Sequence, residues 1–474
     1  MRSLKPLHGI AVVLGLCLML YFTYRHLEYF GNISFLGGIL LLEVIVASLW
    51  RYDERFFALL IVSFAWAGMN VPLEDAWTGG RWLVLAAGAV VGCVVWTKDP
   101  RKPFGSLHLI AFFCICAAFV SATVSSYVQM ASLKALSLLL LFLYCVSGAR
   151  LAVIGREKRF FRGLLWGTEI ALYVTALCYL GLGLHIWGNP NSMGAALSVG
   201  VFPILLWGWI ASDGPGVKLR RLAAVALCCY LVFLSVARAG IVSMAIVTLV
   251  FCLCLHQYKL LIKMAALVAV LVAVTGVLAP ETLSTQIGGM KDELLYKGHK
   301  EEGMLGSRRS PWEKSIASIK EHPLFGTGYG TSPTGDDPGL GFGRFSSSAE
   351  TVREHGSSYM TITEWVGLLG VLPFAGLLAV TARNVWKVCA WMKRAADPSH
   401  YAIPVAMVVL AGLVHAGFED WLFAVGYHVS VFFWVFAFLL ADLVPAAVAV
   451  PAAGVVPRAS RPLPASFGAV VPNR

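Results

Sequence analysis

The sequence predicts an all-α membrane protein that crosses the bilayer repeatedly, with about 12–14 transmembrane helices. Of its 474 residues, 58% are hydrophobic and only 13% are charged. The mean hydropathy is +0.75, a value that excludes a soluble globular protein. Apolar stretches of roughly 17 to 25 residues, the length that crosses a bilayer, recur along the chain.

These stretches divide the chain into four parts. About eleven helices are expected within residues 1–279, and about three within 358–445. Between them lies a polar loop, 280–357, with short helices, and the tail 446–474 is expected to be disordered because it is rich in Ala, Val and Pro. The expected spans are residues 8–24, 33–50, 55–71, 82–97, 106–124, 128–149, 160–183, 192–211, 219–235, 239–256, 260–279, 358–382, 402–420 and 426–445.

The basic residues predict the orientation of the helices. The formal net charge of +11 arises mainly from short segments between the apolar stretches, which indicates membrane topology and a lipid bilayer as partner, with no nucleic acid. With both termini cytoplasmic, the short outer loops hold only Arg25, Arg81, Lys134 and Arg238. Loop 280–357 then faces outward, and long translocated loops are largely exempt from the positive-inside rule.

Three charged residues within apolar stretches are candidates for function. Arg238 stands alone in the stretch from about 222 to 255, where a charge is costly enough to indicate a role. Glu43 and Glu169 are intramembrane acids without evident partners in the sequence. They favour an alternative function, transport of a small anion or a lipid-linked glycan.

The outward loop contains two recognisable patterns. Trp312, Ile316 and Ile319 have the spacing of an amphipathic helix. The glycine-rich run 323–330 is expected to turn the chain sharply. It is not read as a phosphate-binding loop, because no strand precedes it and no Gly-Lys-Ser/Thr follows it.

A series of short motifs runs from about residue 185 to 430, about half of the chain. In order they are GNPN at 188–191, SVARAG at 235–240, Arg308 four residues before Trp312, PLFGTG at 323–328, His355 with Glu364 nine residues later, and GFEDWLFAVG at 417–426. This order resembles the O-antigen ligase and O-antigen polymerase superfamily of bacterial membrane glycosyltransferases. In the family's usual pattern an Asn follows the His, whereas this chain has Gly356.

The resemblance implies a GT-C-like helical fold and inverting glycosyl transfer. A glycan would pass from an undecaprenyl diphosphate carrier to an acceptor hydroxyl at the periplasmic face of the bacterial inner membrane, with no metal and no cofactor. A polymerase of surface polysaccharide or exopolysaccharide uses a second lipid-linked glycan as acceptor. A ligase uses the lipid A core of lipopolysaccharide, or a protein. The motifs do not separate the two, and the oligomeric state is left open.

The chemistry of such a transfer assigns roles to the motif residues. A departing diphosphate needs fixed positive charge, and Arg238 and Arg308 are the candidates. The attacking hydroxyl needs a proton acceptor that is partly neutral near pH 7, which favours His355. His415 and Glu419 lie one helical turn apart, but two ligands do not make a metal site. Supporting candidates are Arg309, Glu364, Asn191, Glu419 and Asp420.

Overall fold

The computed structural model describes most of the expected helical bundle. The described residues are 54–70, 74–98, 103–259, 306–332, 354–395 and 397–445, with scattered positions between 261 and 273. Outside them lie the expected spans 8–24 and 33–50, most of 260–279 and of the loop 280–357, the tail 446–474, and Glu43.

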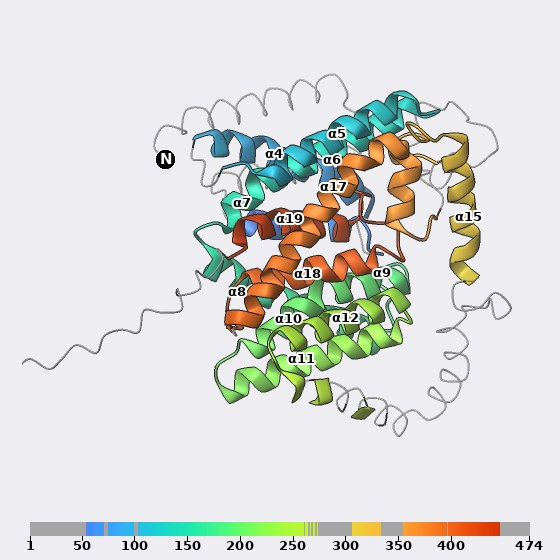
Figure 1. Ribbon diagram of the computed structural model, residues 1–474. Coiled ribbons are helices and arrows are strands. Elements are labelled where there is room, and N and C mark those ends of the chain that lie inside the picture. The colour runs from blue at the N-terminus through green and yellow to red at the C-terminus, as the bar shows by residue number, and fades with distance from the viewer. Residues whose placement is uncertain are drawn as a thin grey trace, which may run out of the picture.

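Every regular element in this part of the chain is a helix (Figure 1). The elements are α3 (Glu54–Trp66), α4 (Glu74–Lys98), α5 (Ser106–Thr123), α6 (Val128–Val146), α7 (Gly148–Val153), α8 (Glu157–Ala176), η3 (Leu177–Gly181), α9 (Pro190–Ala195), η4 (Ala196–Val201), α10 (Phe202–Ile210), α11 (Pro215–Leu234), α12 (Arg238–Cys254), α15 (Gly306–Glu321), α17 (Ser358–Ala395), α18 (Ala402–His415) and α19 (His428–Leu443). The two η elements are π-helical turns that join α8 to its loop and α9 to α10.

The helices confirm the predicted class, an all-α polytopic membrane protein. Within the described residues, six helical segments are long and apolar enough to cross a bilayer, and four shorter apolar helices accompany them. Each expected span that falls in these ranges coincides with a helix or a continuous pair of helices. The six long segments are Trp77–Thr97, Ser106–Thr123, Val128–Val153, Glu157–Gly181, Pro190–Ile210 and Ser358–Ala395.

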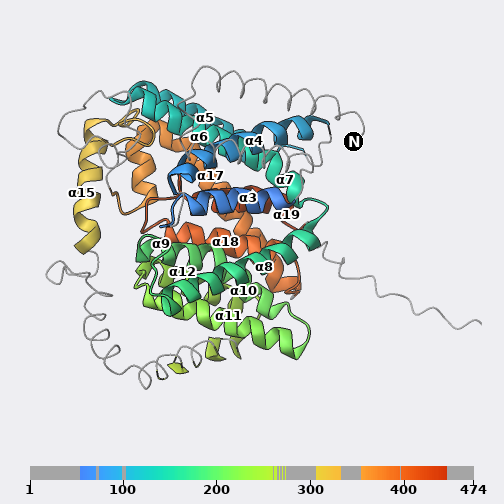
Figure 2. The ribbon, with the colours of Figure 1, turned by 180° about the vertical axis from the view of Figure 1, so that it is seen from behind.

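The two C-terminal helices form the centre of the bundle. Both views show α18 and α19 between a layer that contains α4, α5 and α6 and a layer that contains α10, α11 and α12 (Figures 1 and 2). Residues 428–440 of α19 are all buried, which explains why this helix is apolar on every side. The outer helices instead expose apolar side chains, as a lipid-facing surface requires.

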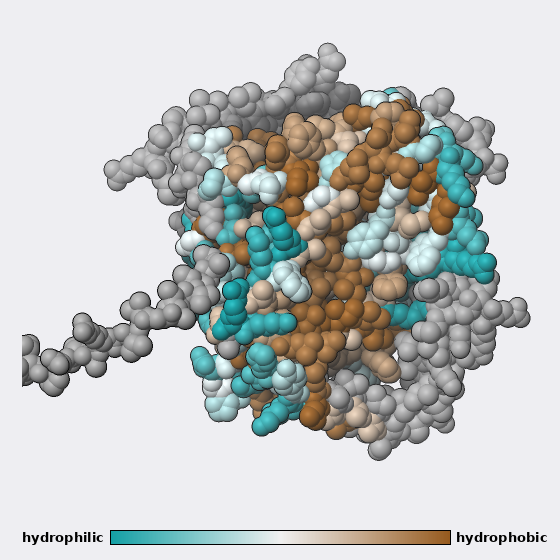
Figure 3. All heavy atoms as spheres, viewed as in Figure 1, coloured by the Kyte–Doolittle hydropathy of each residue, from teal (hydrophilic) through white to brown (hydrophobic). Residues whose placement is uncertain are grey.

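The bundle has two polar ends separated by an apolar band. Figure 3 shows hydrophilic residues over α15 at one end and near the C-terminal part of α17 at the other. At the α15 end, Nη1 of Arg81 donates a hydrogen bond to the carbonyl of Gly426 at 2.8 Å. At the other end, Nε of Arg150 lies 2.6 Å from Oδ2 of Asp442. Each contact joins chain segments that the charge distribution places on the same side of the membrane.

Helix α17 is broken at Gly367, where φ is +68° and ψ is −179°. The run 323–328 pairs with this break: the Thr327 N–H donates to the carbonyl of Glu364 at 3.0 Å, and the Leu368 N–H donates to the carbonyl of Pro323 at 2.7 Å. A Cβ on Gly367 would lie 2.4 Å from the carbonyl carbon of Leu324. The close neighbour of Gly367 is therefore the loop 323–328 and not another helix.

The outer loop is also held by a lysine. Nζ of Lys134, on α6, donates to the carbonyl of Gly330 at 2.5 Å. Gly326, Gly328 and Gly330 all have positive φ, so the sharp turn predicted for the glycine-rich run is confirmed.

Candidate active site

His355 lies in the short turn that leads into α17. Its side chain has no exposed surface. The next residue, Gly356, has a φ of +69°, which bends the chain before α17 begins at Ser358. The backbone N–H of His355 donates a hydrogen bond to Oδ2 of Asp420 at 2.9 Å. The turn between α18 and α19 therefore fixes the position of the histidine.

Both ring nitrogens of His355 have polar neighbours. Nδ1 lies 3.4 Å from Oδ2 of Asp420. On the opposite side, Nε2 lies 2.9 Å from Oγ of Ser332 and 3.4 Å from Oε1 of Glu364. Because α17 begins after His355, the two side chains can lie together despite their separation of nine residues.

The surroundings of His355 change its proton affinity. Burial lowers its pKa, but hydrogen bonds and charge interactions with Asp420 and Glu364 raise it more, so the pKa lies above its ordinary value. Burial alone would raise the pKa of Asp420, but its bonds to His355 hold that pKa below the ordinary value. Asp420 and Glu364 therefore stabilise the imidazolium that forms when the neutral ring accepts a proton.

Arg308 is buried in the first turn of α15 and pairs with two carboxylates. Its Nη1 lies 2.7 Å from Oε1 of Glu354 and its Nη2 lies 2.5 Å from Oε1 of Glu419. Burial raises the pKa of Glu419, whereas the charge of Arg308 lowers it, and the net effect is an increase.

Arg238 begins α12 and lies in the same electrostatic environment. The charges of Arg308 and Glu419 both act on its guanidinium. Val236, just before it, has a φ of +53°, so the chain turns sharply into the helix. Arg308 and His355 contact the Glu419–Asp420 turn, and Arg238 lies close enough for the charges of Arg308 and Glu419 to act on it.

Two supporting candidates lie differently from the others. Arg309 points away from the site: its side chain is 70% exposed and pairs with Glu313 one turn along α15, at 2.9 Å. Asn191 is the second residue of α9. The cap of this helix is Asn189, whose Oδ1 accepts a hydrogen bond from the Ser192 N–H at 2.7 Å.

Two residues of the site were not found from the sequence. Oγ of Ser332 contacts His355 and accepts a hydrogen bond from Nε1 of Trp365 at 3.2 Å. The Trp365 ring also packs edge-on against His355, with ring centroids 5.9 Å apart. Nothing in the polar loop distinguished Ser332 from its neighbours. Trp365 could have been noted because it directly follows Glu364.

Comparison with known families supports this grouping. Residues 223–356 match the family described as O-antigen ligase, and they include Arg238, Arg308 and His355. This segment is similar to the O-antigen ligase family. No curated protein matches the chain. The similarity supports O-antigen ligase-like glycosyl transfer in general by a multi-pass membrane protein.

Glu169, which favoured the transport alternative, has basic partners in the structure. It lies on α8, before the O-antigen ligase segment, and its side chain is almost completely buried. Its carboxylate lies 3.2 Å from Nη2 of Arg220 and 3.7 Å from Nε of Arg221. A buried acid with two basic partners is accounted for by helix packing.

His415 and Glu419, considered above as a metal pair, make other contacts. Nδ1 of His415 accepts a hydrogen bond from Nε1 of Trp421 at 2.9 Å, and Glu419 binds Arg308. Within the described residues, no group of three or more His, Cys, Asp or Glu side chains has the arrangement of a metal site.

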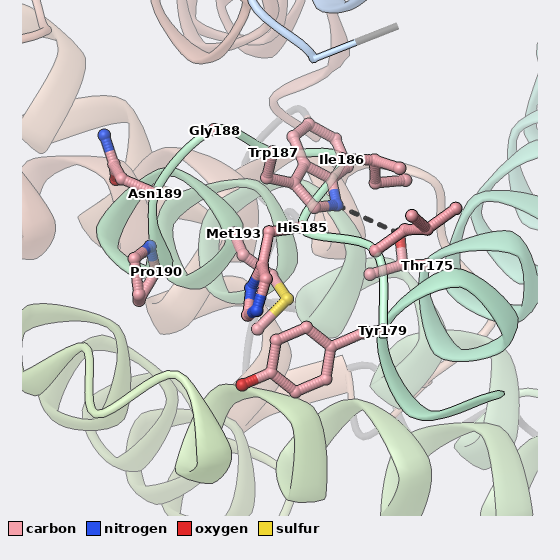
Figure 4. A pocket seen from close by; sticks show the side chains of 10 residues that line it. Thr175, Tyr179, His185, Ile186, Trp187, Gly188, Asn189, Pro190 and Met193 are labelled. Atoms are coloured by element: carbon pink, nitrogen blue, oxygen red, sulfur yellow. Dashed lines mark hydrogen bonds between the residues drawn. The ribbon is translucent and has the colours of Figure 1, made fainter. Parts of the chain in front are cut away.

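A small pocket lies on the chain just before the O-antigen ligase segment (Figure 4). Tyr179 and His185 form one side, Nε1 of Trp187 bonds to Thr175 at 3.1 Å, and Asn189 lies at the rim. Its volume of about 10 Å³ holds about one water molecule. The pocket is therefore too small to hold a sugar.

Proposed function

We propose that the protein transfers a glycan from an undecaprenyl diphosphate carrier to an acceptor hydroxyl, with inversion at the anomeric carbon. The reaction takes place at the periplasmic face of the bacterial inner membrane, with both chain termini in the cytoplasm. The observation that carries the proposal is that Arg308 and His355 contact the Glu419–Asp420 turn, with Arg238 close enough for the charges of Arg308 and Glu419 to act on it.

In the proposed reaction, Nε2 of His355 accepts the proton of the acceptor hydroxyl. The hydroxyl oxygen forms a bond to the anomeric carbon as the bond from that carbon to the diphosphate oxygen breaks. The electron pair of the broken bond remains on the diphosphate. Arg238 and Arg308 stabilise the charge that develops there, and no step uses a metal or nucleotide.

The contacts of His355 determine what must change when the acceptor binds. Oγ of Ser332 holds the position beside Nε2 that the acceptor hydroxyl requires. Ser332 must therefore move by the width of a hydroxyl group, and the acceptor replaces its hydrogen bond. Asp420 stays beside Nδ1 and stabilises the imidazolium that forms when the proton is transferred.

One of the two carboxylates that bind Arg308 can also be replaced when the substrate binds. Glu354 is 67% exposed, whereas Glu419 is only 18% exposed. Because Glu354 is exposed to solvent, an incoming diphosphate can take its place on Arg308. Glu419 remains and holds the guanidinium in its orientation.

The test is a profile of envelope glycans, by gel and mass spectrometry, in a strain that lacks the gene and carries variants at matched membrane levels. We expect His355→Ala and Arg238→Ala to accumulate lipid-linked glycan that the wild type transfers. Arg309→Ala is the matched control, because its side chain points into solvent, and we expect it to act as wild type. The acceptor that lacks glycan distinguishes a ligase from a polymerase.

The same strains separate an enzyme from a transporter. An enzyme requires His355 and tolerates Glu169→Gln, which weakens a packing contact between α8 and α11. A transporter that uses the intramembrane acid shows the reverse. Full transfer by His355→Ala would rule out the proposed mechanism.

A further inference from the structure

A cavity with polar residues in its lining lies at the end of the bundle opposite His355. Its volume is about 280 Å³. It is lined by the start of α5, the C-terminal half of α17 and the end of α19. The far end of α5 reaches the site, where Ser121 donates to the carbonyl of Trp365. An 18-residue helix is about 27 Å long, so the two places are separated by most of the bilayer.

The lining of this cavity presents hydrogen-bond donors. Nδ1 of His108 accepts a hydrogen bond from the Gly105 N–H at 2.9 Å, so in the neutral ring the proton is on Nε2. Among the described residues, that Nε2 has no hydrogen-bond partner. Ser106 and Leu107 lie in the first turn of α5, where backbone N–H groups have no acceptor within the helix.

The cavity wall also contains the side-chain amide of Asn384. It lines the cavity from α17, and its side chain is only 6% exposed. No hydrogen bond of this amide is found in the part of the chain that the structure describes. Because the amide lies in the cavity wall, it can bind a polar group of a ligand there.

The net charge of the lining is positive. Asp442 faces the cavity, but Arg150 binds both of its carboxylate oxygens, at 2.6 and 2.9 Å. Arg150 also lies over the Trp96 ring, 4.3 Å from its centroid. Because this pair is neutral together, the exposed guanidinium of Arg383 at the rim gives the cavity its charge, which suits an anion.

The surface beside the cavity is apolar. On α5, Leu109 is 59% exposed and Phe113 is 52% exposed, and on α17, Leu372 is 65% exposed. These side chains continue from the polar lining along the lipid-facing sides of the same two helices. We propose that the cavity binds the phosphate of an anionic phospholipid whose acyl chains lie along α5 and α17.

The test measures lipid retention by the purified full-length protein. Native mass spectrometry would follow the protein mixed with dioleoylphosphatidylglycerol, with dioleoylphosphatidylcholine, or with inorganic phosphate alone. We expect retention of phosphatidylglycerol over phosphatidylcholine, and a loss of about tenfold in Arg383→Gln, because a hydrogen bond to a charged group is removed. Arg394→Gln is the matched control, since Arg394 lies further along α17 and binds its own helix at Ala390.

Each result decides the proposal. Equal retention of the two lipids, or equal losses in Arg383→Gln and Arg394→Gln, would overturn it. Saturable binding of inorganic phosphate that prevents lipid retention would assign the cavity to a soluble anion and would also overturn it. Folded Asn384→Leu protein that loses lipid retention, but less of it than Arg383→Gln loses, would support the proposal. Lipid retention does not depend on glycosyl transfer, so this test and the glycan profile fail independently.

Discussion

The carboxylate of Asp420 contacts His355 at two points through one oxygen. Oδ2 accepts the backbone N–H at 2.9 Å and lies 3.4 Å from Nδ1. A carboxylate beside Nδ1 favours the tautomer that carries the ring proton on Nδ1. Nε2 can then accept a hydrogen bond from the Ser332 hydroxyl. Trp365 then donates to the same hydroxyl. This chain of donors leaves His355 oriented for the proton transfer proposed above.

The first prediction concerns Asp420→Asn. An amide oxygen can still accept the backbone N–H of His355, so the turn is kept, but the negative charge beside the ring is lost. We expect the transfer rate to fall by about tenfold or more. The acidic limb of the pH–rate profile should move to lower pH, because Asp420 raises the pKa of His355. A profile with an unchanged acidic limb would contradict a positioning role for Asp420.

The second prediction concerns the stability of the wild type relative to His355→Gln. The pKa of His355 is raised in the folded protein, so its contribution is fully present below the unfolded-state pKa of about 6.5. That contribution is lost as the pH rises through the folded-state pKa. Thermal unfolding of both proteins in detergent across this range should show the advantage of the wild type shrinking as pH rises. An advantage that grows with pH would show that the raised pKa is wrong.

The third prediction concerns the break in α17. Gly367→Ala places a Cβ 2.4 Å from the Leu324 carbonyl carbon at a φ of +68°, and we expect a loss of more than about 1 kcal/mol of stability. Gly376→Ala is the control on the same helix, because its nearest neighbour is Cγ2 of Ile110 at 3.7 Å and Ala is a better helix former. Thermal unfolding and loop proteolysis measure both. Equal behaviour of the two variants would show that the loop does not pack against the break.

Hydropathy and charge were sufficient to predict the helical class, because membrane spans are long and uniformly apolar. The sequence separates His355 and Glu364 by nine residues, and the structure places Nε2 and Oε1 3.4 Å apart because α17 begins after the histidine. The sequence did not predict the partner of Glu169, since Arg220 lies 51 positions later and only tertiary packing brings them together. Nor did it predict the break at Gly367, because a glycine within an apolar stretch fits close helix packing equally well.

The loop residue Ser332 shows a further limit of sequence reasoning. It lies 23 positions before His355, in a segment whose composition is polar throughout, and only the pairing of 323–328 with α17 brings its hydroxyl to Nε2. Residues of this kind are recognised from contacts and not from spacing. The residues that were recognised, such as Arg238, are those whose charge is costly where they lie.

The last prediction concerns Gly356, where the family pattern usually has Asn. A Cβ at this position would lie 2.9 Å from Cδ of Arg308, so Gly356→Ala must displace the arginine that is proposed to hold the diphosphate. We expect glycosyl transfer to fall by about tenfold, the effect of losing one charge-assisted contact. Gly183→Ala is the matched control, because Gly183 has a similar φ of +65° with nothing within 4 Å of its Cβ position. Transfer rates at matched protein levels measure both variants. If both lose the same activity, backbone strain and not the position of Arg308 is the cause.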